Sequence, residues 1–114
     1  RKAHRVQTAS GTLFTDPIEG IFNQHPAVYR SALVGVGRAG EQRPVVVVEC
    51  WPLKPGEAAR DLDKLRQELL QLARSRPQTA MIGDVLFHPS MPVDIRHNSK
   101  IFREKLAPWA AERL

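Results

Sequence analysis

The sequence predicts an α+β domain with a small, three-stranded, mostly antiparallel sheet, about three flanking helices and a short strand or hairpin at the N-terminus. Two β-branched runs, residues 28–36 and 45–48, are separated by a short glycine-containing turn, which is typical of an antiparallel pair. Residues 58–72 carry apolar side chains at helical spacing, and residues 85–87 form a third short apolar run. A chain of 114 residues is long enough for one hydrophobic core without disulfides.

The first elements have clear local signals. Residues 6–10 favour a short strand, which Gly11 ends because glycine adopts positive φ at no steric cost. Asp16 and Pro17 predict a helix start, with Asp16 as the N-cap and Pro17 at the first helical position. The helix should stop before Pro26, because proline cannot continue it.

The middle of the chain alternates between strand and helix. Residues 45–48 are four consecutive valines, so we expect this strand to be covered on both faces. The long helix that follows should bury one continuous stripe, since its apolar residues recur at spacings of four and three. These residues are Ala58, Leu62, Leu65, Leu69 and Leu72.

The C-terminal stretch, residues 96–106, changes from a polar loop to an amphipathic helix. Asn98 or Ser99 is predicted as the N-cap, which places Lys100 in the first helical turn. A cation there is disfavoured by roughly 0.3–1 kcal/mol, and such a violation of a local rule often marks a functional residue. The alternative is a solvated lysine that happens to follow a cap. The apolar side of this helix should comprise Ile101, Phe102, Leu106 and Trp109.

Composition excludes several classes of protein. The net charge of +5 and the pI near 10 favour anionic partners, but the basic residues are scattered, which is typical of a solvated surface. A single cysteine excludes an internal disulfide and suits a reducing, cytoplasmic compartment. We expect no membrane span, because no apolar run approaches 18 residues. The chain begins with Arg1 and Lys2 rather than Met, which suggests a processed or excised piece.

Local motifs for metal, nucleophilic or dinucleotide chemistry are missing. The histidines lack the spacing of a helical zinc pair, and the lone cysteine forms no Cys-x-x-Cys motif. Ser10 and Ser99 lack a nucleophile-elbow context. The segment Gly35-Val36-Gly37 precedes a polar turn rather than a helix, which argues against a dinucleotide site. A helix-turn-helix is hard to place between strands, so nucleic-acid binding is not expected.

Five short segments carry a further signal: Arg1-Lys2, Pro17-Ile18-Glu19 through His25-Pro26-Ala27-Val28, Ser31-Ala32-Leu33-Val34-Gly35-Val36, Leu53-Lys54-Pro55-Gly56 and Lys100-Ile101-Phe102-Arg103. In their order and spacing, these segments together resemble the C-terminal lid domain of the ANL superfamily, which contains acyl-CoA synthetases, peptide-synthetase adenylation domains and luciferases. The resemblance covers residues 1–114, nearly the whole chain.

The resemblance implies roles for particular residues. Lys100 would be the catalytic lysine of acid adenylation, while Arg96, His97 and Asn98 would support the loop or contact the nucleotide, with plain surface polarity as the alternative. The hinge would fall at Lys2 and Ala3, although the family usually has Asp or Lys where Ala3 stands. Gly11 would lie on the face used in the second reaction step. Leu13 or Thr12 stands where thioester-forming relatives have arginine, which puts coenzyme A use in doubt.

The resemblance also implies partners. ATP and Mg²⁺ would bind mainly to a larger N-terminal domain, together with a carboxylic acid, and the isolated fragment should be inactive. The string from Val93 to Lys100 most resembles the β-lactone synthetases of bacterial olefin biosynthesis, which adenylate a β-hydroxy acid and close a lactone without coenzyme A. The resemblance also allows for a complex with other enzymes of that pathway. The alternatives are an acyl-CoA or aryl-CoA synthetase lid and, from another class, a non-enzymatic basic interaction module.

Overall fold

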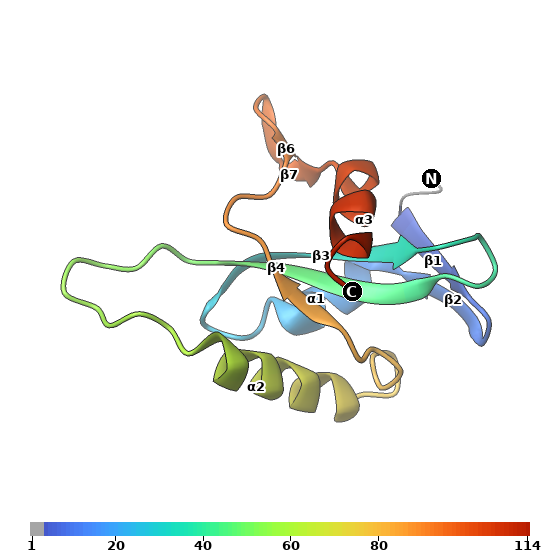
Figure 1. Cartoon of the computed structure of the whole chain (residues 1–114), viewed down its shortest axis with the longest axis horizontal. Helices are drawn as coiled ribbons and strands as arrows, with labels where there is room; N and C mark the ends of the chain where they lie inside the picture. The colour runs from blue at the N-terminus through green and yellow to red at the C-terminus, as the bar shows by residue number, and fades with distance from the viewer. Residues whose placement is uncertain (1–3) are drawn as a thin grey trace.

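The centre of the molecule is a three-stranded sheet built from the β-branched runs. The computed structural model describes residues 4–114, and at residues 97–99 it describes the backbone alone. The strands are β3 (Val28–Val36), β4 (Arg43–Cys50) and β5 (Val85–Phe87), in the order β3-β4-β5 (Figure 1). β3 and β4 pair antiparallel, as predicted, whereas β4 and β5 pair parallel. The sheet is therefore mixed, and the α+β fold class is confirmed.

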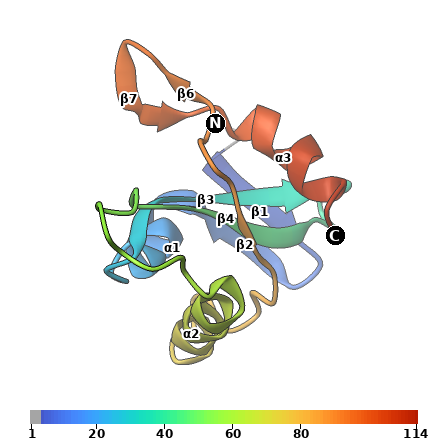
Figure 2. The ribbon, with the colours of Figure 1, turned by 60° about the vertical axis from the view of Figure 1, so that its left-hand side comes forward.

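Strand β4 is buried on both faces, as its four consecutive valines predict. Val46 and Val48 belong to one hydrophobic cluster, and Val45 and Val47 belong to a second cluster on the opposite face. Side chains alternate between the faces of a strand, so β4 supplies both clusters. Helices α1 (Thr15–Phe22) and α2 (Leu62–Arg74) cover the first face, and α3 (Arg103–Ala111) covers the other (Figure 2).

The first two helices form where the sequence predicts them but begin at different residues. Helix α1 starts at Thr15, one residue before the predicted N-cap Asp16, and no side chain caps it. Helix α2 starts at Leu62, because the Asp61 carboxylate accepts a hydrogen bond from Lys64 N at 3.1 Å and caps the helix there. Ala58, which we predicted in the stripe, therefore precedes the helix. Leu65 and Leu69 are buried as predicted, but the prediction is wrong for Leu62, which is 43% exposed.

A hairpin of β1 (Arg5–Thr8) and β2 (Gly11–Phe14) confirms the predicted N-terminal element. Gly11 has φ +139°, so it occupies the left-handed region for which glycine was predicted. It begins β2 rather than ending β1. The proposed hinge at Lys2 and Ala3 lies outside the described residues.

The predicted start of the last helix is wrong. Asn98, Ser99 and Lys100 lie on strand β7 (His97–Ile101), and α3 begins at Arg103 after an N-cap at Phe102 that makes no side-chain hydrogen bond. β7 pairs with β6 (Val93–Asp94) in a small separate sheet.

Non-local pairing explains this difference. Val93 pairs with Ile101, and Phe102 N donates a hydrogen bond to Pro92 O at 2.9 Å. These contacts keep the chain extended past the helix start that Asn98 and Ser99 predict. Ile101 and Phe102 accordingly lie before the helix rather than on its apolar side.

Candidate active-site hairpin

The β6–β7 hairpin carries the predicted catalytic residue, Lys100, and residues 96–98, which were predicted to support the loop or contact the nucleotide. Lys100 is exposed on β7, and Arg96 lies in the turn at the hairpin tip. His97 and Asn98 belong to the same strand, and their side chains lie outside the described part of the structure. The hairpin projects from the body of the molecule beyond α3 (Figure 1). Gly11 is not brought near, since both ribbon views place the β1–β2 turn well away from this hairpin.

The hairpin has an irregular register at Lys100. Val93 pairs with Ile101, but the next residue, Asp94, pairs with His97. Three residues of β7, numbers 98–100, are therefore inserted between the two pairs. Such bulges bend a strand and change the direction of its side chains, and they occur often beside active sites. The bulge sets Lys100 apart from the regular ladder.

The base of the hairpin is fastened to the core. Val93 and Ile101 are half-buried against the cluster under α3. Just before β6, Met91 N donates to the Glu49 carboxylate at 2.9 Å, and Met91 itself is buried in the same cluster. The position of Lys100 is thus set from a base that cannot shift without disturbing the core.

A buried ion pair follows the hairpin directly. Arg103 donates from Nε to Glu19 Oε2 at 3.1 Å and from Nη2 to Glu19 Oε1 at 2.6 Å, and Leu33 N donates to Glu19 Oε2 at 2.8 Å. Burial, the largest effect, raises the pKa of Glu19, while the hydrogen bonds from Arg103 and Leu33 oppose that rise. The pair ties the start of α3, three residues after Lys100, to α1 and β3.

Sequence reasoning did not assign a role to Arg103 or Glu19. Both residues belong to segments that carried the family resemblance, and this was the available signal. Their contact joins positions 84 apart in the chain, so helical spacing or strand alternation could not have revealed it.

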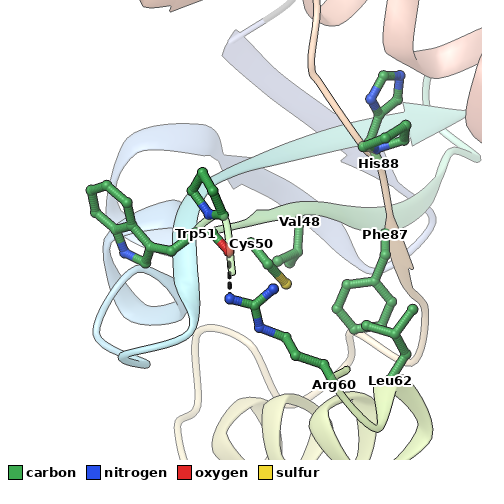
Figure 3. Close-up of a pocket in the computed structure, with 9 residues that line it drawn as sticks. Val48, Cys50, Trp51, Arg60, Leu62, Phe87 and His88 are labelled. Carbon is green, nitrogen blue, oxygen red and sulfur yellow. Dashed lines mark hydrogen bonds between the residues drawn. The ribbon is translucent and has the colours of Figure 1, made fainter. Parts of the chain in front are cut away.

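A separate groove of about 440 Å³ lies between the β4–α2 connection and β5 (Figure 3). Arg60 donates a hydrogen bond from its guanidinium to Trp51 O at one wall, and Phe87 and Leu62 form part of another. Burial raises the pKa of the Cys50 thiol in this groove. None of the lining residues belongs to the β6–β7 hairpin, so Lys100 is not part of this groove.

Two further observations concern metal and membrane. Within residues 4–114, excluding the side chains of 97–99, no three His, Cys, Asp or Glu side chains gather to hold a metal ion. In that same part of the chain, no helix combines the length and the apolar character needed to cross a membrane.

Comparison with curated proteins identifies close relatives. The chain is 52% identical over 113 residues to the olefin β-lactone synthetase of Xanthomonas campestris pv. campestris, and 48% identical over 114 residues to that of Stenotrophomonas maltophilia. The alignments cover 99% and 100% of this chain but 20% of each relative. The chain thus spans about a fifth of the length of these proteins. No protein-family model matches it.

Solved structures of adenylate-forming enzymes share the fold. The amide bond synthetase McbA from Marinactinospora thermotolerans aligns with a TM-score of 0.70 and 21% identity over 96% of this chain and 20% of that one. An anthranilate CoA ligase, AuaEII, in complex with anthranoyl-AMP aligns with a TM-score of 0.73 and 18% identity over 100% of this chain and 22% of that one. ATP-bound MatB from Rhodopseudomonas palustris aligns with a TM-score of 0.71 and 19% identity over 96% of this chain and 20% of that one.

Proposed function

We propose a function from the premise that this chain belongs to the ANL superfamily of adenylate-forming enzymes. It is a domain that aligns with 20% of the length of each of the two olefin β-lactone synthetases. In this proposal residues 1–114 are a C-terminal lid, and a larger N-terminal domain binds ATP, Mg²⁺ and a carboxylic acid. The lid contributes Lys100 to the active site of that domain. The observation that carries the proposal is the exposed Lys100 on a projecting, bulged hairpin whose base is fixed to the core.

The proposed reaction is acid adenylation. A carboxylate oxygen attacks the α-phosphorus of ATP, the bond from that phosphorus to the bridging oxygen breaks, and pyrophosphate leaves. Negative charge builds between the attacking carboxylate and the α-phosphate, and the ammonium of Lys100 stabilises it. A compact, mobile point charge suits this role better than the planar fork of arginine.

The second step is proposed from the names of the relatives. Because the sequence relatives are olefin β-lactone synthetases, the acid is proposed to be a β-hydroxy acid. Its β-hydroxyl oxygen attacks the acyl carbon of the adenylate, the bond from that carbon to the phosphate oxygen breaks, and AMP and a proton leave as the β-lactone closes. Thioester formation with coenzyme A is the competing outcome, since one solved neighbour is a CoA ligase. Mass spectrometry of the products formed by the complete enzyme, with and without coenzyme A, distinguishes lactone from thioester.

Substitution of Lys100 tests the adenylation step. In the complete enzyme, Lys100→Ala should lower pyrophosphate exchange by about 10²–10³ or more, by analogy with the loss of one oxyanion donor, while ATP binding persists. Lys64→Ala is the matched control, because Lys64 is also exposed but lies on α2. Normal exchange in Lys100→Ala would show that the assignment is wrong.

A further inference from the structure

The tip of the β6–β7 hairpin carries an unusually exposed apolar side chain. Ile95 is 93% exposed, whereas the other exposed large hydrophobic side chains in the described part of the chain range from 38% to 56%. It occupies the first position of the two-residue turn that joins Asp94 to His97. Full hydration of such a side chain forgoes the favourable free energy of burial.

Turn formation does not explain an isoleucine at this position. Two-residue hairpin turns favour glycine, asparagine or aspartate, because their preferred types require positive φ. No described non-glycine residue has positive φ, so Ile95 and Arg96 form a turn of another type. The Asp94 carboxylate stabilises it by accepting a hydrogen bond from Arg96 N at 2.9 Å. The turn is therefore maintained by Asp94, and Ile95 is free to serve another purpose.

The hairpin is built to present this side chain at a fixed place. Asp94 is buried, Phe102 N donates to Pro92 O at the base, and Val93 and Ile101 pack on the core. Lys100 leaves the ladder in the bulge between base and tip. Ile95 and Lys100 thus share one short arm, whose free end is turned away from the body of this domain (Figure 1).

We propose that Ile95 is a docking residue, which inserts into an apolar recess of the ATP-binding domain of the same enzyme and so seats Lys100 at the α-phosphate. This inference rests on the proposed function. The docking partner of Ile95 is inferred from the length of the relatives, because 80% of each sequence relative lies outside the aligned part. The nucleotide site on which Lys100 acts is placed in that remaining part. Ile95 is thereby a positioning residue that acts through Lys100.

Kinetics of the complete enzyme provide the first test. Ile95→Ser should lower kcat for pyrophosphate exchange by roughly tenfold or more, since burial of one isoleucine corresponds to about one to two powers of ten in an equilibrium or rate. KM for ATP and the unfolding midpoint should stay unchanged, because Ile95 makes no core contact here. Ile95→Leu should restore most of the rate. Leu53→Ser, which alters an exposed leucine in the β4–α2 connection, should have no effect.

Chemical labelling provides a second test that does not depend on turnover. In the complete Ile95→Cys enzyme, maleimide labelling of the peptide that contains position 95 should be fast without ligands. It should slow severalfold when a non-hydrolysable acyl-adenylate mimic is bound. Labelling that is equally fast in both states overturns the proposal. Protection that depends on protein concentration instead of the mimic also overturns it, because it would indicate contact between two copies.

The two proposals fail in different ways. If Lys100→Ala has normal exchange, the proposed function is wrong. If Lys100→Ala is inactive but Ile95→Ser exchanges at the normal rate, the role of Lys100 stands and only the docking role of Ile95 is overturned.

Discussion

The guanidinium of Arg103 and the carboxylate of Glu19 form a bidentate ion pair with both side chains 9% exposed. Glu19 also accepts a hydrogen bond from Leu33 N, so one carboxylate joins α1, β3 and the start of α3. Because Arg103 follows the Lys100 hairpin by two residues, the pair fixes the point from which that hairpin projects.

Arg103→Met should therefore destabilise the protein strongly. Removing one partner of a buried ion pair leaves an uncompensated charge, which typically costs about 3–5 kcal/mol. Urea unfolding of the variant measures the loss. The control is Arg38→Met, since Arg38 and Glu41 form an exposed pair at 3.9 Å and such pairs contribute about 0–1 kcal/mol. Equal small effects of both substitutions would contradict a structural role for the Arg103 pair.

Gly35 should not tolerate a methyl group. A Cβ at this position would lie 2.6 Å from Cδ of Gln42. The Gln42 side chain is held in place because its Oε1 accepts a hydrogen bond from Gln7 N at 2.9 Å. Gly35→Ala should displace Gln42 and lose a hydrogen bond between β1 and the β3–β4 turn, a cost of about 1 kcal/mol. The free energy of unfolding measures it.

Gly20→Ala is the matched control for Gly35. Gly20 lies inside α1, and a Cβ added there would meet nothing within 4 Å outside the helix's own backbone, so alanine should stabilise the helix by about 0.5–1 kcal/mol. Opposite signs for the two substitutions are expected, and destabilisation by both to the same extent would show that the Gln42 contact is not the cause.

Acidification should weaken the packing of His88. Burial, the largest effect, lowers the pKa of His88; Glu49 opposes this shift and Arg113 adds to it. The imidazole lies against the Trp109 ring, with ring centroids 4.6 Å apart and planes tilted by 49°. Its Nδ1 accepts a hydrogen bond from Ser90 N, which requires an unprotonated Nδ1.

The sign of this pH dependence follows from proton linkage. A base whose pKa is lower in the folded state contributes stability above its unfolded pKa of about 6.5, and that contribution is lost as pH falls through the folded pKa. Urea unfolding between pH 7 and acidic pH should reveal this loss. His88→Asn retains a side-chain acceptor for Ser90 N but does not titrate, so it should lack this component of the pH dependence. An identical pH dependence in the variant would contradict the role of His88.

Alkylation of Cys50 should be slow at neutral pH. Its pKa is raised chiefly by burial, with Arg60 opposing and Glu49 reinforcing the rise, and only the thiolate is nucleophilic. Iodoacetamide labelling followed by peptide mass spectrometry should give a slower rate at position 50 than at an exposed Ile95→Cys in the same protein. Comparable rates at pH 8 would show that the Cys50 thiol is not shielded and that its pKa is not raised.

Much of the fold could be predicted from local pattern. The strands at residues 28–36 and 85–87 have the predicted bounds, and the four valines of β4 are buried on both faces as expected. The ANL resemblance rested on the order of short segments, and the sequence relatives and the shared fold support it. The roles of Lys100, Arg96 and Gly11 stay predictions.

The placement of Lys100 required the tertiary structure. Residue periodicity establishes which segments are apolar and on which face, because strand and helix periods are local properties of the chain. It does not establish pairing between distant residues, and here the pairing of Val93 with Ile101 kept Lys100 on a strand where a cap signal had suggested a helix. Residue periodicity likewise does not establish the Arg103–Glu19 ion pair or the exposure of Ile95 at the hairpin tip. Each depends on how separate elements pack, and local preferences are too weak to decide that.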